Sequence, residues 1–511
     1  MATNTINIQD IIEEGSLKEM FTKRDGDRSS VLDRARNCAK LTIPSIMPDS
    51  GSSETSDFVT PYQALGSRLV NNLASKLLLT LLPPNTSFFR LLPPEDLIKA
   101  QDPASDAASK IEANLITIEQ ELMKQIEREA LRVPTFDAIK TLIVTGNSLL
   151  YKTETGLKSY KLADYVIVRD FSGNPVDIIT REELTKDTLP ADIISKLPPE
   201  DLEKDGKLTL YTRAVNKLGS WYEYQMVEST LVDGSEATYK DSTKLPYIPL
   251  RWTAISGENY GRGLVEQYIG DFRSLEALYQ LVLENCAISA RTIFGKKPGS
   301  VIDIEDLNGA DNGSCISGDL ENDITVLRVE KNSDMQSPLQ MIQDLTRRLE
   351  QAFLVASSAT RDSERTTATE IRYMAGDLEE SLGGLYSILS LEYQRPLANL
   401  LLQQSKIDIK SVGVDIVIVT GIEALGRNLE LDKLRQFNKL LQELGSPEIV
   451  LQRMNIDNYI AMIGNALSLD TANLIKSAEQ IQAEQQQQAT DGLMQQGASN
   501  MVQNATMPQQ Q

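Results

Sequence analysis

The most informative absence in this 511-residue chain is histidine, which does not occur at all. Without it there is no serine or cysteine hydrolase with a histidine base, and no histidine-ligated metal centre. The sequence also has no GxxxxGK phosphate-binding loop and no GxGxxG after a predicted strand. These absences predict a protein without a cofactor or resident metal and argue against an enzyme.

Cysteine is scarce as well, with Cys38, Cys286 and Cys315 and no CxxC pair. That usage is typical of a reducing compartment and gives neither a disulfide framework nor a zinc site. The N-terminus lacks the basic-then-apolar pattern of a signal peptide. The longest strongly apolar run, Leu77 to Leu82, is far shorter than the roughly 20 residues that span a bilayer. We therefore predict no membrane partner.

Acidic residues are abundant, with 72 Asp and Glu against 51 Lys and Arg, a formal charge of −21 and a pI near 4.7. An acidic surface repels the phosphate backbone, which argues against an ordinary DNA-binding domain. It is compatible with a protein past which DNA slides without sticking. The length predicts several domains.

The stretch from Glu364 to Leu402 carries the clearest helix signals. Thr367 and Glu370 form a capping pair, and an apolar stripe follows at helical spacing. Gly383 and Gly384 cost about 1 kcal/mol each inside a helix, so we expect another backbone to approach closely there. Pro396 is expected to bend the helix or end it near Arg395. The pattern alone is also typical of a buried core helix. The stripe comprises Ile371, Met374, Leu378, Leu382, Leu385 and Leu389.

Further helices are predicted by apolar residues at steps of three and four. They lie at 31–41, from Pro61 to about residue 81, at 110–132 with a break at Pro134, and at 338–356. A long helix follows the glycine-rich loop SGENYGRG (256–263), with a nearly heptad stripe that predicts packing against a core or against copies of itself. Its stripe comprises Leu264, Tyr268, Phe272, Leu275, Tyr279, Val282 and Cys286. Residues 1–30 are polar and are expected to be only partly ordered.

Between Ser148 and Trp252 the pattern changes to alternating β-branched and aromatic residues with glycine-containing turns, which predicts an antiparallel β-rich region. Residues 292–332 contain strand-like pieces around an acidic loop. That loop fails the calcium-binding pattern because Ala310 stands where an oxygen ligand belongs. A further strand is predicted at 414–421, and the C-terminus is Gln-rich and of low complexity.

Several segments together resemble the portal (head-to-tail connector) proteins of short-tailed, podovirus-type bacteriophages. They are RARNCAKLTIP, ALGSRLVNNLASKLLLTLLPPNTSFFRL, GRGLVEQYIGDFRSLEALYQLVLE and the run from Arg365 to Leu391. They occur in the family's order between about Val31 and Asn428. The double-glycine helix and the Gly-Arg-Gly helix start are the most specific parts.

The resemblance implies an α+β, mostly helical portal fold with a β-rich wing region, assembled as a ring. The implied wing covers 1–262, with its β-rich part at 148–255, and a further wing helix and strand at 371–424. The remaining implied parts are stem helices at 263–292 and 336–356, a clip at 293–335, a channel loop at 357–370, and a crown with a C-terminal helical barrel at 425–511.

The resemblance also implies a function. Twelve copies would form a ring at one capsid vertex, conduct double-stranded DNA during packaging and ejection, and nucleate procapsid assembly. Implied partners are the terminase large subunit, the tail adaptor or tail tube protein, the major capsid and scaffolding proteins, and internal core proteins. The protein would be in the host cytoplasm during assembly and then at the head–tail junction of the virion. The apolar stripes would pack against neighbouring copies.

Specific residues follow from these assignments. We expect the channel loop to face DNA, since Arg361, Arg365 and Arg372 balance Asp362, Glu364 and Glu370 there; the expected DNA-facing residues are Arg361, Arg365, Thr366 and Thr367. Expected stem-packing residues are Leu264, Tyr268, Phe272, Leu275, Tyr279, Leu345, Leu349 and Phe353. Expected wing-helix packing residues are Leu378, Leu382, Gly383, Gly384 and Leu385.

Two other classes remain open at this point. An acidic, helical scaffold or capsid-interior protein would share the composition but would form no ring with an axial hole. A metal-dependent hydrolase could use the carboxylates of Asp303, Glu305 and Asp306.

Overall fold

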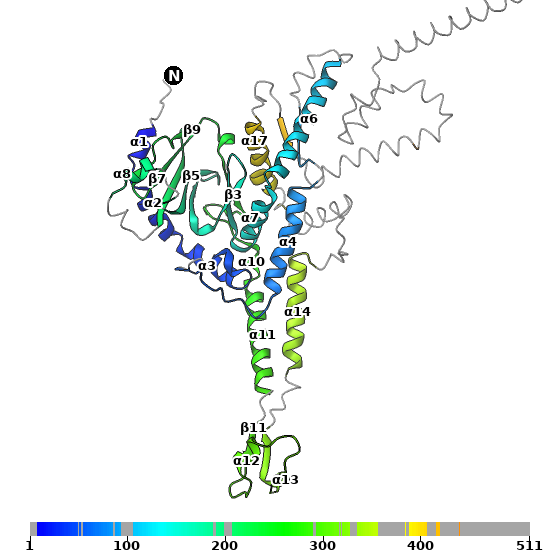
Figure 1. The fold of residues 1–511 in the computed structure, drawn as a ribbon. Coiled ribbons are helices and arrows are strands. Elements are labelled where there is room, and N and C mark those ends of the chain that lie inside the picture. Colours follow the sequence, from blue (N-terminus) through cyan, green and yellow to red (C-terminus); the bar gives the residue numbers. More distant parts are fainter. Residues whose placement is uncertain are drawn as a thin grey trace, which may run out of the picture. The chain divides into compact units, whose positions relative to one another are not determined.

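The computed structural model is a mixed α and β protein (Figure 1). It describes residues 8–49, 51–52, 55–84, 87–92, 106–185, 187, 191–198, 207–289, 293–315, 317, 319–327, 335–355, 384, 388–405, 415–418 and 439. The chain divides into two compact units. One comprises residues 1–86 and 126–405, and the other comprises 87–125 and 406–511.

The largest sheet of the first unit is an antiparallel meander. Its strands follow chain order, and a short sixth strand, β9 (Ala237–Tyr239), pairs with β7. The middles of β5 and β6 are covered on both faces, because four and five consecutive residues there are buried although successive side chains point to opposite faces. The predicted antiparallel β-rich region is therefore present. The ordered strands are β4 (Tyr165–Arg169), β5 (Pro175–Thr185), β6 (Lys207–Lys217), β7 (Ser220–Val227) and β8 (Thr230–Leu231).

Two N-terminal helices cover one face of this sheet, α1 (Ile8–Ile12) and α2 (Leu17–Asp27). Their apolar residues Ile11, Leu17 and Phe21 are buried against the sheet. An ion-pair network adds to the attachment, because Arg213 of β6 contacts Asp177 at 2.8 Å and Glu14 at 2.9 Å. The expectation that residues 1–30 are only partly ordered is therefore wrong for residues 8–30, since these helices bury apolar side chains despite their polar composition.

A second sheet of three strands has the order β10 (Tyr247–Arg251), β2 (Asn147–Lys152), β3 (Leu157–Tyr160). It adjoins a group of helices: α3 (Ser29–Lys40), α4 (Leu65–Leu81) and α7 (Arg132–Thr145). The α4 stripe predicted from the sequence is buried: Leu65, Leu69, Leu73, Leu77 and Leu81.

Two predicted helix boundaries are wrong. The helix α4 begins at Leu65 rather than Pro61: residues 57–63 lie in neither helix nor strand, and the Gln63 side chain accepts the Gly66 amide at 2.8 Å. Pro134 lies in the first turn of α7 rather than between helices, where its missing N–H costs nothing.

The long helix predicted after the glycine-rich loop is present in two pieces, α10 (Leu264–Gln267) and α11 (Ile269–Ser289), with a break at Tyr268. Its counterpart α14 spans Gln336–Ala352. Between them in sequence lies a small two-stranded antiparallel sheet, β11 (Ile293–Lys296) with β12 (Ile324–Leu327), accompanied by α12 (Ile304–Asn308) and α13 (Leu320–Asp323). The acidic segment thus contains a short helix and is not only a loop.

Pro396 does not end its helix. A π-helical turn, η5 (Ser390–Gln394), leads directly into α17 (Arg395–Gln404), with Pro396 at the start of α17. A π turn removes the need for the hydrogen bond that proline cannot donate and relieves the clash of its ring with the preceding turn.

The remaining elements of the first unit are short. They are η1 (Pro44–Ile46), η2 (Leu162–Asp164), α8 (Ala191–Lys196) and η4 (Ser242–Lys244). Within the described ranges, no helix is long and apolar enough to cross a membrane.

The second unit contains β1 (Phe89–Leu92) paired antiparallel with β13 (Asp415–Ile418), which confirms the strand predicted around 414–421. The helix α6 (Asp106–Arg128) contributes its residues up to Gln125 to this unit. Within it, Glu119 is buried and accepts the Leu91 amide at 2.7 Å.

Candidate functional site

The helices α11 and α14 lie side by side (Figure 1) and pair through aromatic side chains. Phe272 of α11 meets Phe353, just beyond α14, edge to face with centroids 5.8 Å apart. Tyr268 packs on the same Phe353 ring at 6.2 Å. Such pairs contribute about 0.5–1.5 kcal/mol beyond the burial of their area. Tyr268, at the break between α10 and α11, therefore takes part in the contact with the end of α14 through its ring.

The structure brings the predicted stem-packing residues together within a single chain. Tyr268 and Tyr279 are half-buried, and the others are buried: Leu264, Phe272, Leu275, Leu345, Leu349 and Phe353. The expectation that this stripe awaits a neighbouring copy is thus wrong for its buried members. Their apolar area is already covered within the same chain, by the other stem helix or by neighbouring helices such as α7.

Polar contacts fix the helix pair to α4. Arg348 pairs with Asp271 at 3.2 Å across α14 and α11, and Arg68 of α4 pairs with Glu350 at 2.6 Å. These pairs are partly exposed and so contribute little free energy. Lys76 of α4 is buried and donates to the Leu354 carbonyl at 2.5 Å, which satisfies a carbonyl past the end of α14.

Other apolar side chains of the same two helices stay about half exposed in the described part of the chain. On α11, Leu281 is 48% exposed, Leu283 50% and Ile288 50%. On α14, Leu339 is 46% exposed and Met341 50%. The intrachain contact therefore accounts for only one side of each helix.

The glycine-rich loop places the start of α10 against the end of α7. Gly146 has φ of +80°, and a Cβ there would lie 2.4 Å from the Gly263 nitrogen. A Cβ on Gly263 would lie 2.9 Å from the Ile143 carbonyl oxygen. The Asn147 side chain accepts the Gly261 amide at 2.7 Å and donates to its carbonyl at 3.0 Å. The two backbones approach too closely for any side chain larger than hydrogen.

The same loop covers the edge of the six-stranded sheet. The amide of Ile167 donates to the Tyr260 hydroxyl at 3.2 Å, and the amide of Arg169 donates to Asn259 Oδ1 at 2.8 Å. Two outward-facing amides of the edge strand β4 are thereby hydrogen-bonded, so they are not available to pair with a strand of another chain.

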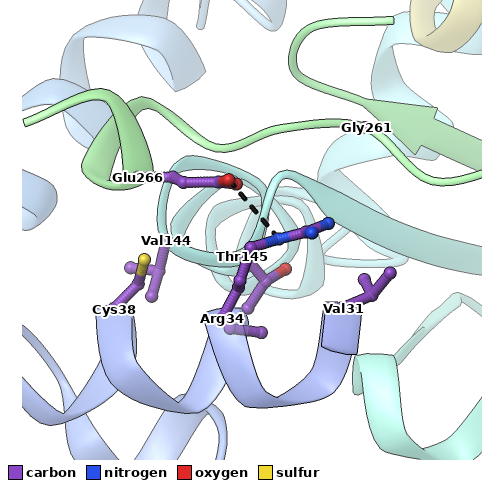
Figure 2. Close-up of a pocket in the computed structure, with 8 residues that line it drawn as sticks. Val31, Arg34, Cys38, Val144, Thr145, Gly261 and Glu266 are labelled. Carbon is purple, nitrogen blue, oxygen red and sulfur yellow. Dashed lines mark ion pairs between the residues drawn. The ribbon is translucent and has the colours of Figure 1, made fainter. Parts of the chain in front are cut away.

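A small depression lies between α3, the end of α7 and the start of α10 (Figure 2). Arg34 Nε and Glu266 form an ion pair across it at 3.4 Å, and Cys38 lines its floor. It has no room for a water-sized molecule, and burial raises the pKa of the Cys38 thiol to about 12. This is packing between helices and offers neither a ligand site nor a reactive thiol.

In the small β11–β12 sheet, the acidic side chains serve local structure. Asp303 accepts the Glu305 amide at 3.1 Å and so caps α12. Glu305 and Asp306 are exposed. Among the described residues, no group of three His, Cys, Asp or Glu side chains could hold a metal ion. These contacts give the hydrolase alternative no support.

The predicted DNA-facing residues Arg361, Arg365, Thr366 and Thr367 lie outside the described residues. So do the wing-helix residues Leu378, Leu382, Gly383 and Leu385. Gly384 is described and exposed, and nothing described lies within 4 Å of a Cβ built on it. The close backbone approach expected at the double glycine is therefore not found at Gly384 within the described chain.

Three consecutive residues of η5 each hold a different element, and sequence reasoning did not identify them. Glu392 accepts from Arg251 of β10 at 3.1 Å. The Tyr393 hydroxyl lies 2.6 Å from that of Thr135 in α7, and Gln394 donates to the Leu81 carbonyl at 2.7 Å. This turn thus ties α17 to a strand and two helices.

Comparison with known proteins assigns the family. A sequence profile described as "Bacteriophage head to tail connecting protein" matches residues 14–475. The portal protein of Enterobacteria phage T3 is 37% identical over 494 residues, covering 93% of this chain and 91% of that protein. The portal protein of Escherichia phage T7 is 35% identical, covering 96% and 94%. That of Enterobacteria phage SP6 is 33% identical, covering 93% and 92%.

This chain therefore belongs to the bacteriophage head-to-tail connecting protein family, and within it to the portal proteins of podovirus-type phages. It is a structural protein of the virion head–tail junction and not an enzyme. Among solved structures it matches a chain from the neck of a native GTA particle computed with C12 symmetry. The identity is 11%, the TM-score 0.33, and the match covers 72% of this chain and 85% of the other.

Proposed function

We propose that twelve copies of this chain form a ring at one capsid vertex, through which double-stranded DNA enters during packaging and leaves during ejection. The observation that carries the proposal is the pattern on α11, which has apolar side chains on opposite faces although the described part of its own chain covers only one of them. The proposal also rests on membership of the portal family.

The apolar side chains of α11 lie on two opposite sides of the helix. An α-helix advances about 100° per residue, so Leu281 lies half a turn around the helix from Phe272, and Ile288 lies on nearly the same side as Leu281. Phe272 faces α14 and is buried, whereas Leu281 and Ile288 are about half exposed. An apolar face of a helix is normally covered by another element. A second copy of the chain would supply the missing cover.

Contact between different surfaces of identical copies generates a ring when the rotation per copy closes. Such a ring would carry −21 formal charges per copy. DNA affinity depends on lysine and arginine neutralising phosphates and releasing counterions, so a bore of this composition would hold DNA weakly. Weak contact suits a conduit, because tight contact would stall translocation.

In this proposal, residues 263–292 and 336–356 are the stem, and the clip at 293–335 docks the terminase large subunit and later the tail adaptor or tail tube protein. The loop at 357–370 faces DNA through Arg361, Arg365, Thr366 and Thr367. The wing comprises 1–262 and 371–424, with Leu378, Leu382, Gly383, Gly384 and Leu385 packing its helix, and the crown and barrel comprise 425–511. ATP hydrolysis is assigned to terminase because this chain has no phosphate-binding loop.

The same proposal assigns further partners by resemblance to the family. They are the major capsid and scaffolding proteins, with which the ring would nucleate procapsid assembly, and internal core proteins. A scaffold or capsid-interior role is the alternative, and it predicts assemblies without an axial hole.

The test compares the wild-type chain with a Leu281→Ser, Ile288→Ser double variant by mass photometry and negative-stain microscopy. The wild type is expected to form rings with an axial hole. The double variant should require at least about tenfold more protein to assemble, which corresponds to a weakening of about 1.4 kcal/mol at each subunit interface.

Leu218→Ser is the matched control, because Leu218 is 76% exposed at the tip of the β6–β7 hairpin and far in sequence from the stem. It should assemble like the wild type. A wild-type protein that remains a monomer at every salt concentration would refute the ring, and solid assemblies without a hole would favour the scaffold alternative.

A further inference from the structure

An extended segment before α4 displays apolar side chains to solvent. Phe58 is 42% exposed, Val59 90% and Tyr62 57%. Residues 58–62, here called the apolar arm, lie in neither helix nor strand. Single exposed apolar residues are ordinary, but a cluster within five residues marks an interaction surface.

The C-terminal end of the arm is firmly attached to the stem helix. The carboxylate of Glu276 in α11 accepts the Tyr62 amide at 2.9 Å and the Gln63 amide at 3.3 Å. Gln63 is 1% exposed; its side chain donates to the Leu41 carbonyl at 2.7 Å and accepts the Gly66 amide at 2.8 Å. Two backbone amides and the buried Gln63 side chain therefore fix the C-terminal end of the arm beside α11.

The described part of the chain makes few contacts with the rest of the arm. Within the described residues, the amides of Phe58, Val59 and Thr60 make no hydrogen bond. Val59 gains almost nothing from burial because it keeps 90% of its exposure. An extended peptide with open backbone groups and outward apolar side chains is suited to contact with another protein surface.

The charge distribution along the sequence indicates which protein surface the arm contacts. Residues from Phe58 to Ser67 carry no charge, in a chain whose formal charge is −21. Two copies of so acidic a chain repel each other over most of their surfaces. A ten-residue neutral stretch is a place where one copy can approach another without that repulsion.

The arm borders α11 on the face opposite to Leu281 and Ile288, so the two faces together offer the two different surfaces that a ring contact between identical copies requires. Glu276 and Leu283 are seven residues apart and lie on one face of α11, since at about 100° per residue both fall within about 40° of Phe272 and far from Leu281. Leu283 is 50% exposed, and nothing in the described chain covers it. We infer that the apolar arm docks on a second copy of this chain and, with Leu283, forms a clasp between neighbouring subunits. This inference rests on the proposed ring.

The first experiment measures assembly of a Phe58→Ser, Val59→Ser, Tyr62→Ser variant by mass photometry across protein concentration. The concentration for half-maximal ring formation should rise at least tenfold, whereas the thermal midpoint of the unassembled chain should stay that of the wild type. The matched control is Phe171→Ser, which removes a side chain that is 96% exposed on the β4–β5 turn. It should leave ring formation unchanged.

A second experiment identifies the occupant directly. Photocrosslinking from p-benzoylphenylalanine in place of Val59, in purified wild-type-length protein, should give covalent dimers and higher ladders of this chain. Rings that form normally in the triple variant, with only intrachain crosslinks from position 59, would overturn the clasp while leaving the ring intact. Absence of rings in the wild type would instead refute the proposed function, and the clasp with it.

Discussion

At the scale of single residues, the most unusual polar group is Glu223, a carboxylate only 5% exposed on β7. Its described partners are two phenols: Tyr239 of β9 donates at 2.8 Å and Tyr247 of β10 at 3.1 Å. Tyr151 of β2 packs against Tyr247 with its ring tilted and the centroids 4.8 Å apart. Burial raises the pKa of the Glu223 carboxyl, and the two phenol hydrogen bonds offset this only in part. The group therefore ties the two sheets together at some electrostatic cost.

This cost predicts a pH dependence. Because the pKa of Glu223 is higher in the folded chain than in the unfolded chain, its contribution to stability is present below the unfolded value and lost as pH rises through the folded value. Glu223→Gln removes the titrating group but can still hydrogen-bond both phenols. The variant should have a higher thermal midpoint than wild type at pH 8, and the difference should narrow towards pH 5.5.

The control for this prediction is Glu13→Gln, a substitution of an exposed carboxylate on the same unit. Its thermal midpoint should follow that of the wild type across the whole range. A Glu223→Gln midpoint that lies below wild type at pH 8, or a difference that does not vary with pH, would contradict the account of a carboxyl whose pKa is raised by burial.

At the scale of elements, the glycines of the loop before α10 and the glycine within α11 make opposite demands. A Cβ on Gly263 would lie 2.9 Å from backbone atoms of Gly146, Ile143 and Val144, none of which can move as a side chain could. A Cβ on Gly270, near the start of α11, would meet nothing within 4 Å. The chain thus contains a glycine that packing requires and one that packing does not.

Alanine substitutions should separate the two. Gly263→Ala is expected to destabilise the monomer by about 1–3 kcal/mol, the usual cost of overpacking. Gly270→Ala should stabilise it by about 0.5–1 kcal/mol, because alanine loses less entropy in a helix. Thermal or denaturant unfolding of the two variants measures the difference, and equal effects of both would contradict the close backbone approach.

The buried faces of these helices could be predicted from the sequence, but their partners could not. The stripes of α4, α11 and α14 were predictable because helical spacing of leucine and phenylalanine reports directly which faces are buried. The partner of a stripe was not predictable, since Phe272 and Leu281 are equally apolar, yet one faces α14 and the other faces solvent. Periodicity identifies a face to be covered and not what covers it.

Contacts that join distant segments escaped prediction for a related reason. Glu276 looks like any solvated glutamate in a helix, and only the fold brings the amides of Tyr62 and Gln63 to it. The π turn at Ser390–Gln394 has no sequence signature beyond the proline that follows it. The N-terminal helices were missed because few apolar residues, such as Phe21, suffice when a sheet supplies the other half of the core.

At the scale of the whole molecule, the charge of −21 per copy bears on how a ring handles DNA. Against that background, Arg361 and Arg365 would be among the few cations offered to a duplex in the proposed channel loop. Replacing both with glutamate changes the charge by −4 per copy at that loop. In the proposed ring, repulsion would be concentrated where the copies surround the axis, so the effect should greatly exceed that of the same change elsewhere.

We therefore expect the Arg361→Glu, Arg365→Glu variant to assemble rings like the wild type, while particles built with it lose packaged DNA or fill incompletely. The measurement is nuclease-resistant DNA per particle, alongside ring formation by negative stain. Lys161→Glu with Lys240→Glu makes the same charge change at exposed positions of the sheet region and should package normally.

Loss of rings in the arginine variant would refute the loop assignment, since a channel loop contacts DNA rather than holding subunits together. Equal packaging defects in both variants would show that total acidity matters and the position of the arginines does not.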